Sequence, residues 1–504
     1  MRRFAPYLCL LPVFALLAVF ERDLLYQVQE QNLFLHTPLF FEQQMVRAGG
    51  LLTWAGCYLT QFFYYPLLGA GLLCLLWAFF LWLFRWAFRL SDAWTGLLPV
   101  SCLLLTVVSL GYWVYYLKLP GHAFCATLGC LLAVGLAGLY SRVPRKSGLS
   151  MTFILLTACL GYPLFGFYGL WAVVMMGFIG GLADTCRVAD LLTAAMSVAG
   201  VPLICYCTLY HQTPLENIYW AALPVYAHVG ERFPAYYLPF VCIVITTLFL
   251  TVRHRWPRLS KSLRWGRGVI LVLVAVSVAV FWQKDRNFHR ELSMSRSMEQ
   301  SNWDDVLQRA RTGKGEPTRA VCLMKNLALF RLGRPADDMF RYPEGAKRPD
   351  APFNIRMVHT VGKQIYLQYG LTNYCYRWCM EDGVEYGWTV ERLKLMALCS
   401  LLNGETVAAQ RFLNLLKKTA FHRQWAQHYE ECLHNPRLIY RDKVLAPVLP
   451  LIRSDNFLTA DRSQLELFLI EHLLSSPGAT REQQELMQRT RYYYQRTRHQ
   501  LVEP

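Results

Sequence analysis

The residues best suited to chemistry form a short charged run directly after the first apolar segment. Glu21 and Asp23 flank Arg22 at the start of the longest loop between apolar segments, roughly residues 21–65. A carboxylate held at a membrane edge can act as a general base on an acceptor hydroxyl, and two neighbouring carboxylates can bind a divalent metal ion. Glu21 and Asp23 are therefore candidate site residues. The alternative is that these charges only mark the end of a membrane span.

The same loop carries a candidate phosphate-binding residue. Arg47 precedes the flexible pair Gly49-Gly50, and its forked guanidinium matches the geometry of a lipid phosphate. The segment from Leu24 to Phe41 is rich in glutamine and aromatic residues and predicts a helix lying in the membrane interface.

A second loop, residues 210–235, contains further candidates for substrate binding. Trp220 offers an aromatic face to a sugar, and Arg232 offers a partner for phosphate. His228 and Glu231 are one helical turn apart, which would also suit a metal pair, but the sequence offers no third ligand nearby. Three interspersed prolines predict an irregular element rather than a regular helix.

The elements that must position these residues are membrane helices. The chain has 504 residues, is 54% hydrophobic and only 17% charged, and has a mean hydropathy of +0.23. This composition is typical of a polytopic membrane protein. About nine apolar segments approach spanning length: Phe4–Phe20, Pro66–Phe84, Gly96–Tyr116, His122–Tyr140, Leu149–Tyr162, Phe165–Ala183, Ala189–Leu209, Tyr236–Val252 and Gly268–Trp282.

The basic residues predict the orientation of these spans. With the N-terminus in the cytoplasm, 14 basic residues of short loops lie inside and four lie outside, as the positive-inside rule requires. Nine spans then place everything after Trp282 in the periplasm of a bacterial inner membrane. The net charge of +17 follows from the same rule, so we do not expect nucleic acid as a partner.

The chain changes character near Gln283. Residues 1–282 form the predicted transmembrane domain, and residues 283–504 are polar, rich in arginine and patterned as amphipathic helices. Gly370 and Gly404 are 34 residues apart, the period of a tetratricopeptide repeat, and each has a small residue five positions later, Cys375 and Ala409. The expected fold is therefore all-α, with a degenerate helical-hairpin domain after the membrane domain. Such a domain either binds a periplasmic protein or caps the membrane domain.

Several other functions lose support. The spans contain almost no ionisable side chains, which argues against ion-coupled transport. No nucleotide-binding loop, nucleophile elbow or zinc-protease motif occurs. The five cysteines after residue 283 include no Cys-x-x-Cys pair, and Cys375 and Cys379 share one helix face, where we expect packing rather than a bridge.

The layout resembles that of the GT-C superfamily of glycosyltransferases. The likeness rests on the many spans, the Glu21-x-Asp23 motif at the start of the first outer loop, the interfacial segment after it and a C-terminal periplasmic domain. It implies a polyprenyl-phosphate-linked sugar as donor, with Asp23 corresponding to the catalytic carboxylate of that loop and Glu21 as its partner. The whole chain also resembles an uncharacterised inner-membrane family of Gram-negative bacteria, through the stretch from Ala48-Gly-Gly-Leu-Leu-Thr-Trp to Gln61-Phe-Phe-Tyr-Tyr-Pro66.

Two functions therefore remain open. One is a GT-C-like transferase at the outer leaflet, and the other is a non-enzymatic membrane scaffold whose helical repeats bind a partner in envelope assembly. Nine spans are more than an anchor needs, which favours the transferase.

Overall fold

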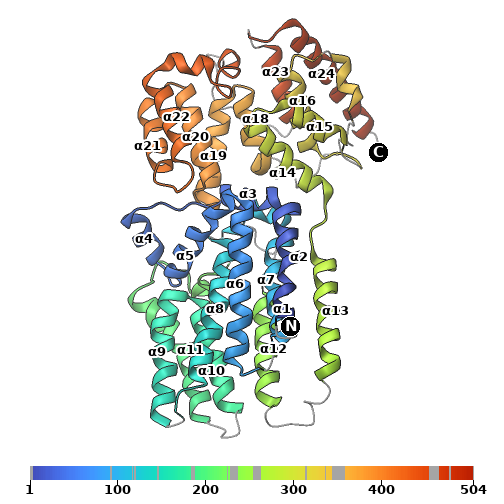
Figure 1. Ribbon diagram of the computed structural model, residues 1–504. Coiled ribbons are helices and arrows are strands. Elements are labelled where there is room, and N and C mark those ends of the chain that lie inside the picture. Colours follow the sequence, from blue (N-terminus) through green and yellow to red (C-terminus); the bar gives the residue numbers. More distant parts are fainter. Residues whose placement is uncertain are drawn as a thin grey trace. The chain divides into compact units, whose positions relative to one another are not determined.

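The computed structural model divides the chain into two compact units, unit 1 (Met1–Gln283) and unit 2 (Lys284–Pro504) (Figure 1). The division lies next to the change of composition at Gln283. The structure describes residues 4–90, 93–115, 117–118, 121–144, 147–182, 188–223, 225–226, 237–253, 263–312, 315–334, 336–342, 358–452, 465–475 and 478–502.

Unit 1 is built from helices, with one antiparallel pair of two-residue strands among its described residues. Its elements are α1 (Ala5–Leu8), α2 (Leu10–Ala15), η1 (Leu16–Phe20), α3 (Arg22–Glu30), α4 (Pro38–Met45), α5 (Gly50–Thr60), η2 (Gln61–Tyr64), α6 (Pro66–Ala87), η3 (Trp94–Gly96), α7 (Leu97–Val108), η4 (Gly111–Tyr115), β1 (Leu117–Lys118), α8 (His122–Tyr140), α9 (Ser147–Phe165), α10 (Phe167–Leu182), α11 (Val188–Thr208), η5 (Leu215–Trp220), β2 (Val225–Tyr226), α12 (Leu238–Arg253) and α13 (Leu263–Phe281).

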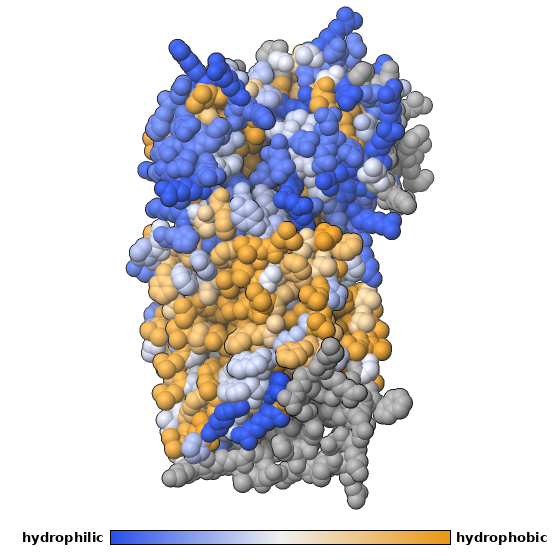
Figure 2. Space-filling view, in the orientation of Figure 1, coloured by the Kyte–Doolittle hydropathy of each residue, from blue (hydrophilic) through white to orange (hydrophobic). Residues whose placement is uncertain are grey.

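Fewer helices than the predicted nine are long and apolar enough to cross a membrane. Among the described residues four qualify, within α6, α8, α9 and α11, and a fifth counts if the apolar part of α13 is joined to the helix that follows it. Four shorter apolar helices of 10–17 residues occupy other predicted spans: Ala5–Phe20, Trp94–Val108, Phe167–Gly181 and Leu238–Leu248. Figure 2 shows an apolar surface over this unit. Its exposed apolar residues include Leu67, Leu75, Leu160 and Ile204. Such a surface is typical of a protein that meets lipid.

The interfacial segment is two helices, not the single predicted one. Helix α3 ends at Glu30, a non-helical stretch follows, and α4 begins only at Pro38. Thr37 caps α4 by accepting a hydrogen bond from the Phe40 N–H on its side chain (3.2 Å), and proline is favourable in the first turn because it lacks the N–H that a helix leaves unpaired there. The capping residue and the proline together start a new helix, which the hydrophobic pattern alone did not predict.

Polar side chains join the helix ends of unit 1 that lie away from α3–α5. Arg142 donates to the Gly138 carbonyl (2.6 Å) at the end of α8 and to the Trp86 carbonyl (2.8 Å) at the end of α6, so one cation satisfies two helix C-termini. The buried Asp190 carboxylate accepts hydrogen bonds from Tyr140 and Ser150, both at 2.8 Å. These contacts tie α8, α9 and α11 together.

Unit 2 is a succession of helices joined by short turns. Its described elements are α14 (Arg286–Glu299), α15 (Trp303–Thr312), α16 (Arg319–Arg331), η8 (Ala336–Arg341), η9 (Val358–Gly362), α18 (Lys363–Gln368), α19 (Thr372–Tyr386), α20 (Val390–Leu402), α21 (Thr406–Leu416), α22 (Arg423–His434), η10 (Pro436–Arg441), η11 (Leu449–Leu451), α23 (Leu465–Leu474) and α24 (Arg481–Val502). Consecutive helices pack in pairs, including α18 with α19 and α20 with α21.

Two of these pairs repeat the same turn. Gly370 follows α18 and Gly404 follows α20, both in the left-handed region at φ +78° and +75°. In each turn the residue after glycine donates its N–H to the carbonyl five residues earlier, from Leu371 to Tyr366 (2.9 Å) and from Glu405 to Ser400 (2.8 Å). The small residues five positions on, Cys375 and Ala409, are fully buried. The 34-residue spacing therefore corresponds to a repeated helical hairpin.

The core of unit 2 also holds a buried ionic cluster. Lys363 Nζ pairs with Asp382 Oδ2, and Arg392 Nε lies 3.9 Å from the same oxygen. All three side chains are at most 2% exposed. Removing one partner of such a cluster typically costs about 3–5 kcal/mol, because a buried charge is left uncompensated. These contacts fix η9–α18 against α19 and α20.

Substitution of the two turn glycines tests this arrangement. An L-residue in the left-handed region costs roughly 1–2 kcal/mol. A Cβ at Gly370 would also lie 2.7 Å from the Leu451 carbonyl carbon, whereas no described atom lies within 4 Å of one at Gly404. We expect Gly404→Ala to lower the free energy of unfolding by about 1 kcal/mol and Gly370→Ala to lower it further, measured by thermal unfolding of the full-length protein in detergent. Equal losses would contradict the close contact at Gly370.

Candidate functional site

Glu21 links the beginning of α3 to the end of α13. It precedes α3 and is 1% exposed, and its carboxylate accepts a hydrogen bond from Trp282 Nε1 at 2.6 Å. The Phe20 ring meets the Trp282 ring edge to face at 6.4 Å. This charge-assisted bond gives Glu21 a structural role in joining two segments that are 261 positions apart.

Asp23 lies in the first turn of α3 and is half-buried. A carboxylate is favourable there because the N-terminal end of a helix carries partial positive charge. Glu21 and Asp23 are two positions apart, and such neighbours do not face each other on a helix. Among the described residues, no three His, Cys, Asp or Glu side chains are arranged to hold a metal ion. Of the two carboxylates, only Asp23 is partly exposed, because Glu21 is buried against Trp282.

The segments that carry Arg47 and Trp220, from the two predicted loops, meet at a close backbone contact that we call the glycine junction. It comprises Gly49, Gly166, Ala221 and Ala222. A Cβ on Gly49 would lie 2.5 Å from the Ala222 Cβ, and a Cβ on Gly166 would lie 2.5 Å from the Ala221 carbonyl oxygen. Only glycine fits at positions 49 and 166, where φ is +81° and +58°. Arg47 and Trp220 each lie within two residues of this contact.

The junction exists because the break between α9 and α10 frees two backbone groups. In an unbroken helix the Phe167 N–H would donate to the Pro163 carbonyl. Instead, the Pro163 carbonyl accepts from the Gly49 N–H (2.9 Å), and the Phe167 N–H donates to the Ala221 carbonyl (2.9 Å). Each loop thus satisfies one backbone group that the break exposes, as buried backbone groups require.

Trp220 is held as an aromatic platform. Its ring stacks on Phe167 with a centroid distance of 6.3 Å and an interplanar angle of 14°, and it remains 53% exposed. Two tyrosines fasten the segment η5 that carries it: Tyr162 donates to the Ile218 carbonyl (2.7 Å), and Tyr219 donates to the Ala199 carbonyl (3.0 Å). One face of Trp220 is therefore packed, and the side chain is pre-oriented for stacking with a ligand.

Phe167 also packs against Phe240, in an aromatic group that the sequence analysis did not include in the site. Phe240 contacts Phe167 at 5.0 Å and Trp171 at 5.4 Å between ring centroids. Trp171 is 5% exposed, and its indole N–H has no hydrogen-bond partner among the described residues. In the sequence, Trp171 is only an apolar residue of a predicted span, and nothing there connects it to Trp220.

A second aromatic group comes from the segments on either side of Arg47, the stretch after α3, α4 and α5. Phe34 packs at 5.3 Å against Phe40 and Tyr58 and at 5.5 Å against Trp54. The Trp54 ring stacks on Tyr58 with an interplanar angle of 12°. This group fixes α4 on α5, and the exposed Arg47 follows α4.

Two further contacts fasten the loop regions of unit 1 to each other. Asn32 donates to the Cys57 carbonyl (3.0 Å) and accepts from the Gly121 N–H (3.4 Å), which joins the segment after α3 to α5 and α8. Strand β1 pairs with β2, with Lys118 opposite Val225. The predicted binding residues His228, Glu231 and Arg232 lie outside the described residues, directly after the part of the second loop that β1 holds.

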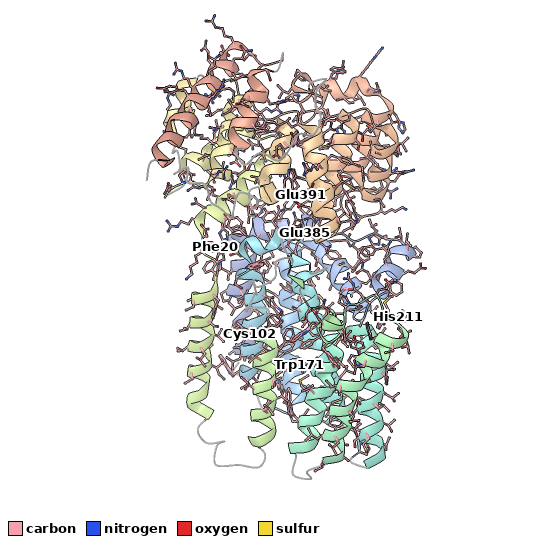
Figure 3. All side chains as sticks on the ribbon, turned by 180° about the vertical axis from the view of Figure 1, so that it is seen from behind. Phe20, Cys102, Trp171, His211, Glu385 and Glu391 are labelled. Carbon is pink, nitrogen blue, oxygen red and sulfur yellow. The ribbon has the colours of Figure 1, made fainter. Side chains whose placement is uncertain are left out.

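The catalytic and binding candidates do not all gather in one place. Figure 3 shows Phe20, the neighbour of Glu21, and His211, from the second loop, on opposite flanks of unit 1. Helix α3 packs on η2 and α6, whereas the turn after α4 packs on the turn between α9 and α10. The structure brings Arg47 and Trp220 to the glycine junction, while Glu21 is held at Trp282.

The glycine junction requires a glycine at position 49, and this requirement can be tested. Alanine there must adopt φ +81° and collide with Ala222, so we expect Gly49→Ala to lower the thermal midpoint of the full-length protein in detergent by several degrees, since ~1 kcal/mol already shifts a domain of this size by roughly 2–4 °C. Gly200→Ala is the matched control, because Gly200 lies inside α11 with no described atom within 4 Å of an added Cβ. A Gly49→Ala variant as stable as Gly200→Ala would disprove the close packing.

Comparison with known proteins identifies a family but no activity. No curated protein and no solved structure shows a significant match to the chain. A family model described as a family of unknown function (DUF6057) matches residues 1–480, which include all of unit 1 and most of unit 2. The chain therefore belongs to the DUF6057 family of unknown function.

Proposed function

We propose that the protein is an integral membrane glycosyltransferase of the GT-C type, which takes a sugar from a polyprenyl phosphate at the outer leaflet of a bacterial inner membrane. The observation that carries the proposal is the glycine junction, because it brings the segments of Arg47 and Trp220 into contact. A guanidinium and an exposed indole suit the phosphate and the sugar of one lipid-linked substrate.

Asp23 is the proposed general base. In the proposed step its carboxylate removes the proton of an acceptor hydroxyl, the hydroxyl oxygen attacks the anomeric carbon, and the polyprenyl phosphate leaves with the electrons of the broken bond. Arg47 pairs with the leaving phosphate and stabilises its charge. Glu21 supports Asp23 indirectly, because its bond to Trp282 fixes the start of α3. No step is routed through a metal ion.

A comparison of lipid-linked sugars tests this assignment. In a deletion strain complemented with Asp23→Asn or Arg47→Gln, we expect one envelope glycan to disappear and its lipid-linked donor to accumulate, as in the uncomplemented strain. The readout is mass spectrometry of extracted lipid-linked sugars and envelope glycans, with wild-type complementation as reference and immunoblotting to show equal protein levels.

Matched controls come from the same loop. Glu42 and Arg22 are exposed there, and neither belongs to the proposed site. Glu42→Gln and Arg22→Gln should therefore restore the wild-type glycan profile. Full rescue by Asp23→Asn, or an unchanged profile in the deletion strain, would refute the transferase.

The proposed topology is nine crossings with the N-terminus in the cytoplasm and unit 2 in the periplasm. It requires the four shorter apolar helices to cross together with the longer ones, which a thinned bilayer or flanking aromatic residues permit. We expect alkaline phosphatase fused after Pro504 to be active and a green fluorescent protein fused there to be dark. The opposite result would mean an even number of crossings and would place unit 2 in the cytoplasm.

A second candidate is a membrane scaffold, and the repeated hairpins of unit 2 favour it. Helix α19 exposes Met380 and Val384 one turn apart, and Trp388 follows it at 42% exposure. An apolar face on a helical-hairpin array suits a periplasmic protein partner. Unchanged lipid-linked sugars in the deletion strain would select this function over the transferase.

A further inference from the structure

Three buried cysteines form a cluster in unit 2. Cys375 and Cys379 come from α19 and Cys399 comes from α20, and all three are 0% exposed. Helices α19 and α20 pack against each other and are joined by the short turn Gly387–Thr389, and Cys375 and Cys399 lie 12 and 10 residues from its two ends, at similar levels of the hairpin. Cys379 and Cys399 both influence the pKa of the Cys375 thiol. The other two described cysteines of this unit, Cys322 and Cys432, are buried elsewhere, on α16 and α22. The cluster therefore has a central thiol with two neighbours.

We propose that Cys375 and Cys399 are a redox modification site at which a two-electron oxidant forms a disulfide between α19 and α20. Neither the family description nor the proposed transferase or scaffold function assigns such a site. The bridge would add a covalent link to the hairpin that the turn Gly387–Thr389 already joins.

Helix geometry selects Cys399 as the partner of Cys375. Cys375 and Cys379 are four residues apart on one helix, where Cβ atoms are about 5–6 Å apart. A disulfide needs Cβ atoms roughly 3.5–4.5 Å apart, so this pair could bridge only if α19 were distorted. Cys399 approaches from a different helix, and its side chain can adjust by rotation without breaking the hydrogen bonds of α19.

The chemistry balances with hydrogen peroxide as oxidant. The Cys375 thiolate attacks peroxide to give a sulfenic acid and hydroxide, which takes up the released proton as water. The Cys399 thiol then displaces the sulfenic oxygen, and a second water leaves as the disulfide forms. Two thiols and one peroxide thus give one disulfide and two waters.

Burial controls when this reaction occurs. Burial raises the pKa of all three thiols, while the nearby Lys363 ammonium lowers that of Cys375 and Cys379. Since the thiolate is the reactive form, the cluster is nearly inert while α19 and α20 are closed and reacts when they separate. The site would report local opening of this hairpin under oxidising conditions, which prevail outside the cytoplasm.

Peptide mapping of the full-length protein tests the proposal. The detergent-purified protein is treated with hydrogen peroxide a few degrees below its unfolding midpoint, denatured with N-ethylmaleimide and digested for mass spectrometry. We expect a cross-linked peptide pair containing Cys375 and Cys399, reversed by dithiothreitol. The pair should persist in Cys379→Ser and Cys432→Ser and be lost in Cys399→Ser.

Oxidant entry has an internal control. Cys432 is also buried, at 1% exposed, and its oxidation to sulfinic acid shows that peroxide reaches the interior of unit 2. A Cys375–Cys379 link, or unlinked Cys375 and Cys399 in samples where Cys432 is oxidised, would overturn the proposal. Circular dichroism of each variant shows whether the substitution preserves the helical fold.

Discussion

The break between α9 and α10 imposes the constraint on which the loop regions of unit 1 depend. Gly166 takes a left-handed conformation, so the Phe167 N–H does not form the helical hydrogen bond to the Pro163 carbonyl. In surroundings without water, each unpaired backbone group would cost several kcal/mol, and each therefore needs a partner from another segment. Gly49 and Ala221 supply these partners. The break, and not a side-chain motif, thus decides which two loops meet.

Unit 2 depends on a different constraint, the repetition of one turn. Glycine in the left-handed conformation ends α18 and α20 in the same way, and a fully buried small residue then lets the next helix pack closely. The ionic cluster of Lys363, Asp382 and Arg392 adds specificity, because its charges can be satisfied only in one arrangement of α18, α19 and α20. The same close packing buries Cys375 and Cys399 on neighbouring helices. Their positions in the sequence alone do not predict this.

The sequence predicted the local features well and the long-range contacts poorly. Helices, the change near Gln283 and the hairpin period follow from hydrophobic periodicity and glycine spacing, which are local properties. The separation of α3 from α4 was missed because Thr37 and Pro38 outweigh the apolar pattern around them. The role of Glu21 was also hidden, because its partner Trp282 is 261 positions away. Trp171 and Phe240 could not be assigned to the site, since apolar residues in a membrane helix carry no sign of their neighbours.

The residues of the candidate site differ in how firmly the structure connects them. Arg47 and Trp220 are linked by backbone contacts, so their proximity depends on the fold and not on flexible side chains. Asp23 lies in the first turn of α3, which packs on η2 and α6. In the proposed step the base acts on the hydroxyl that attacks the anomeric carbon, and that carbon carries the leaving phosphate. The transferase therefore requires Asp23 and Arg47 to reach one reacting centre.

Native mass spectrometry of the protein released from membrane nanodiscs tests the central claim most directly, because it detects the lipid that the protein retains. The account predicts a bound polyprenyl phosphate, with or without its sugar, in the wild type and in Arg22→Gln, and its loss in Arg47→Gln. Bulk phospholipid alone in all three proteins, or an equal polyprenyl-phosphate adduct in Arg47→Gln, would contradict it.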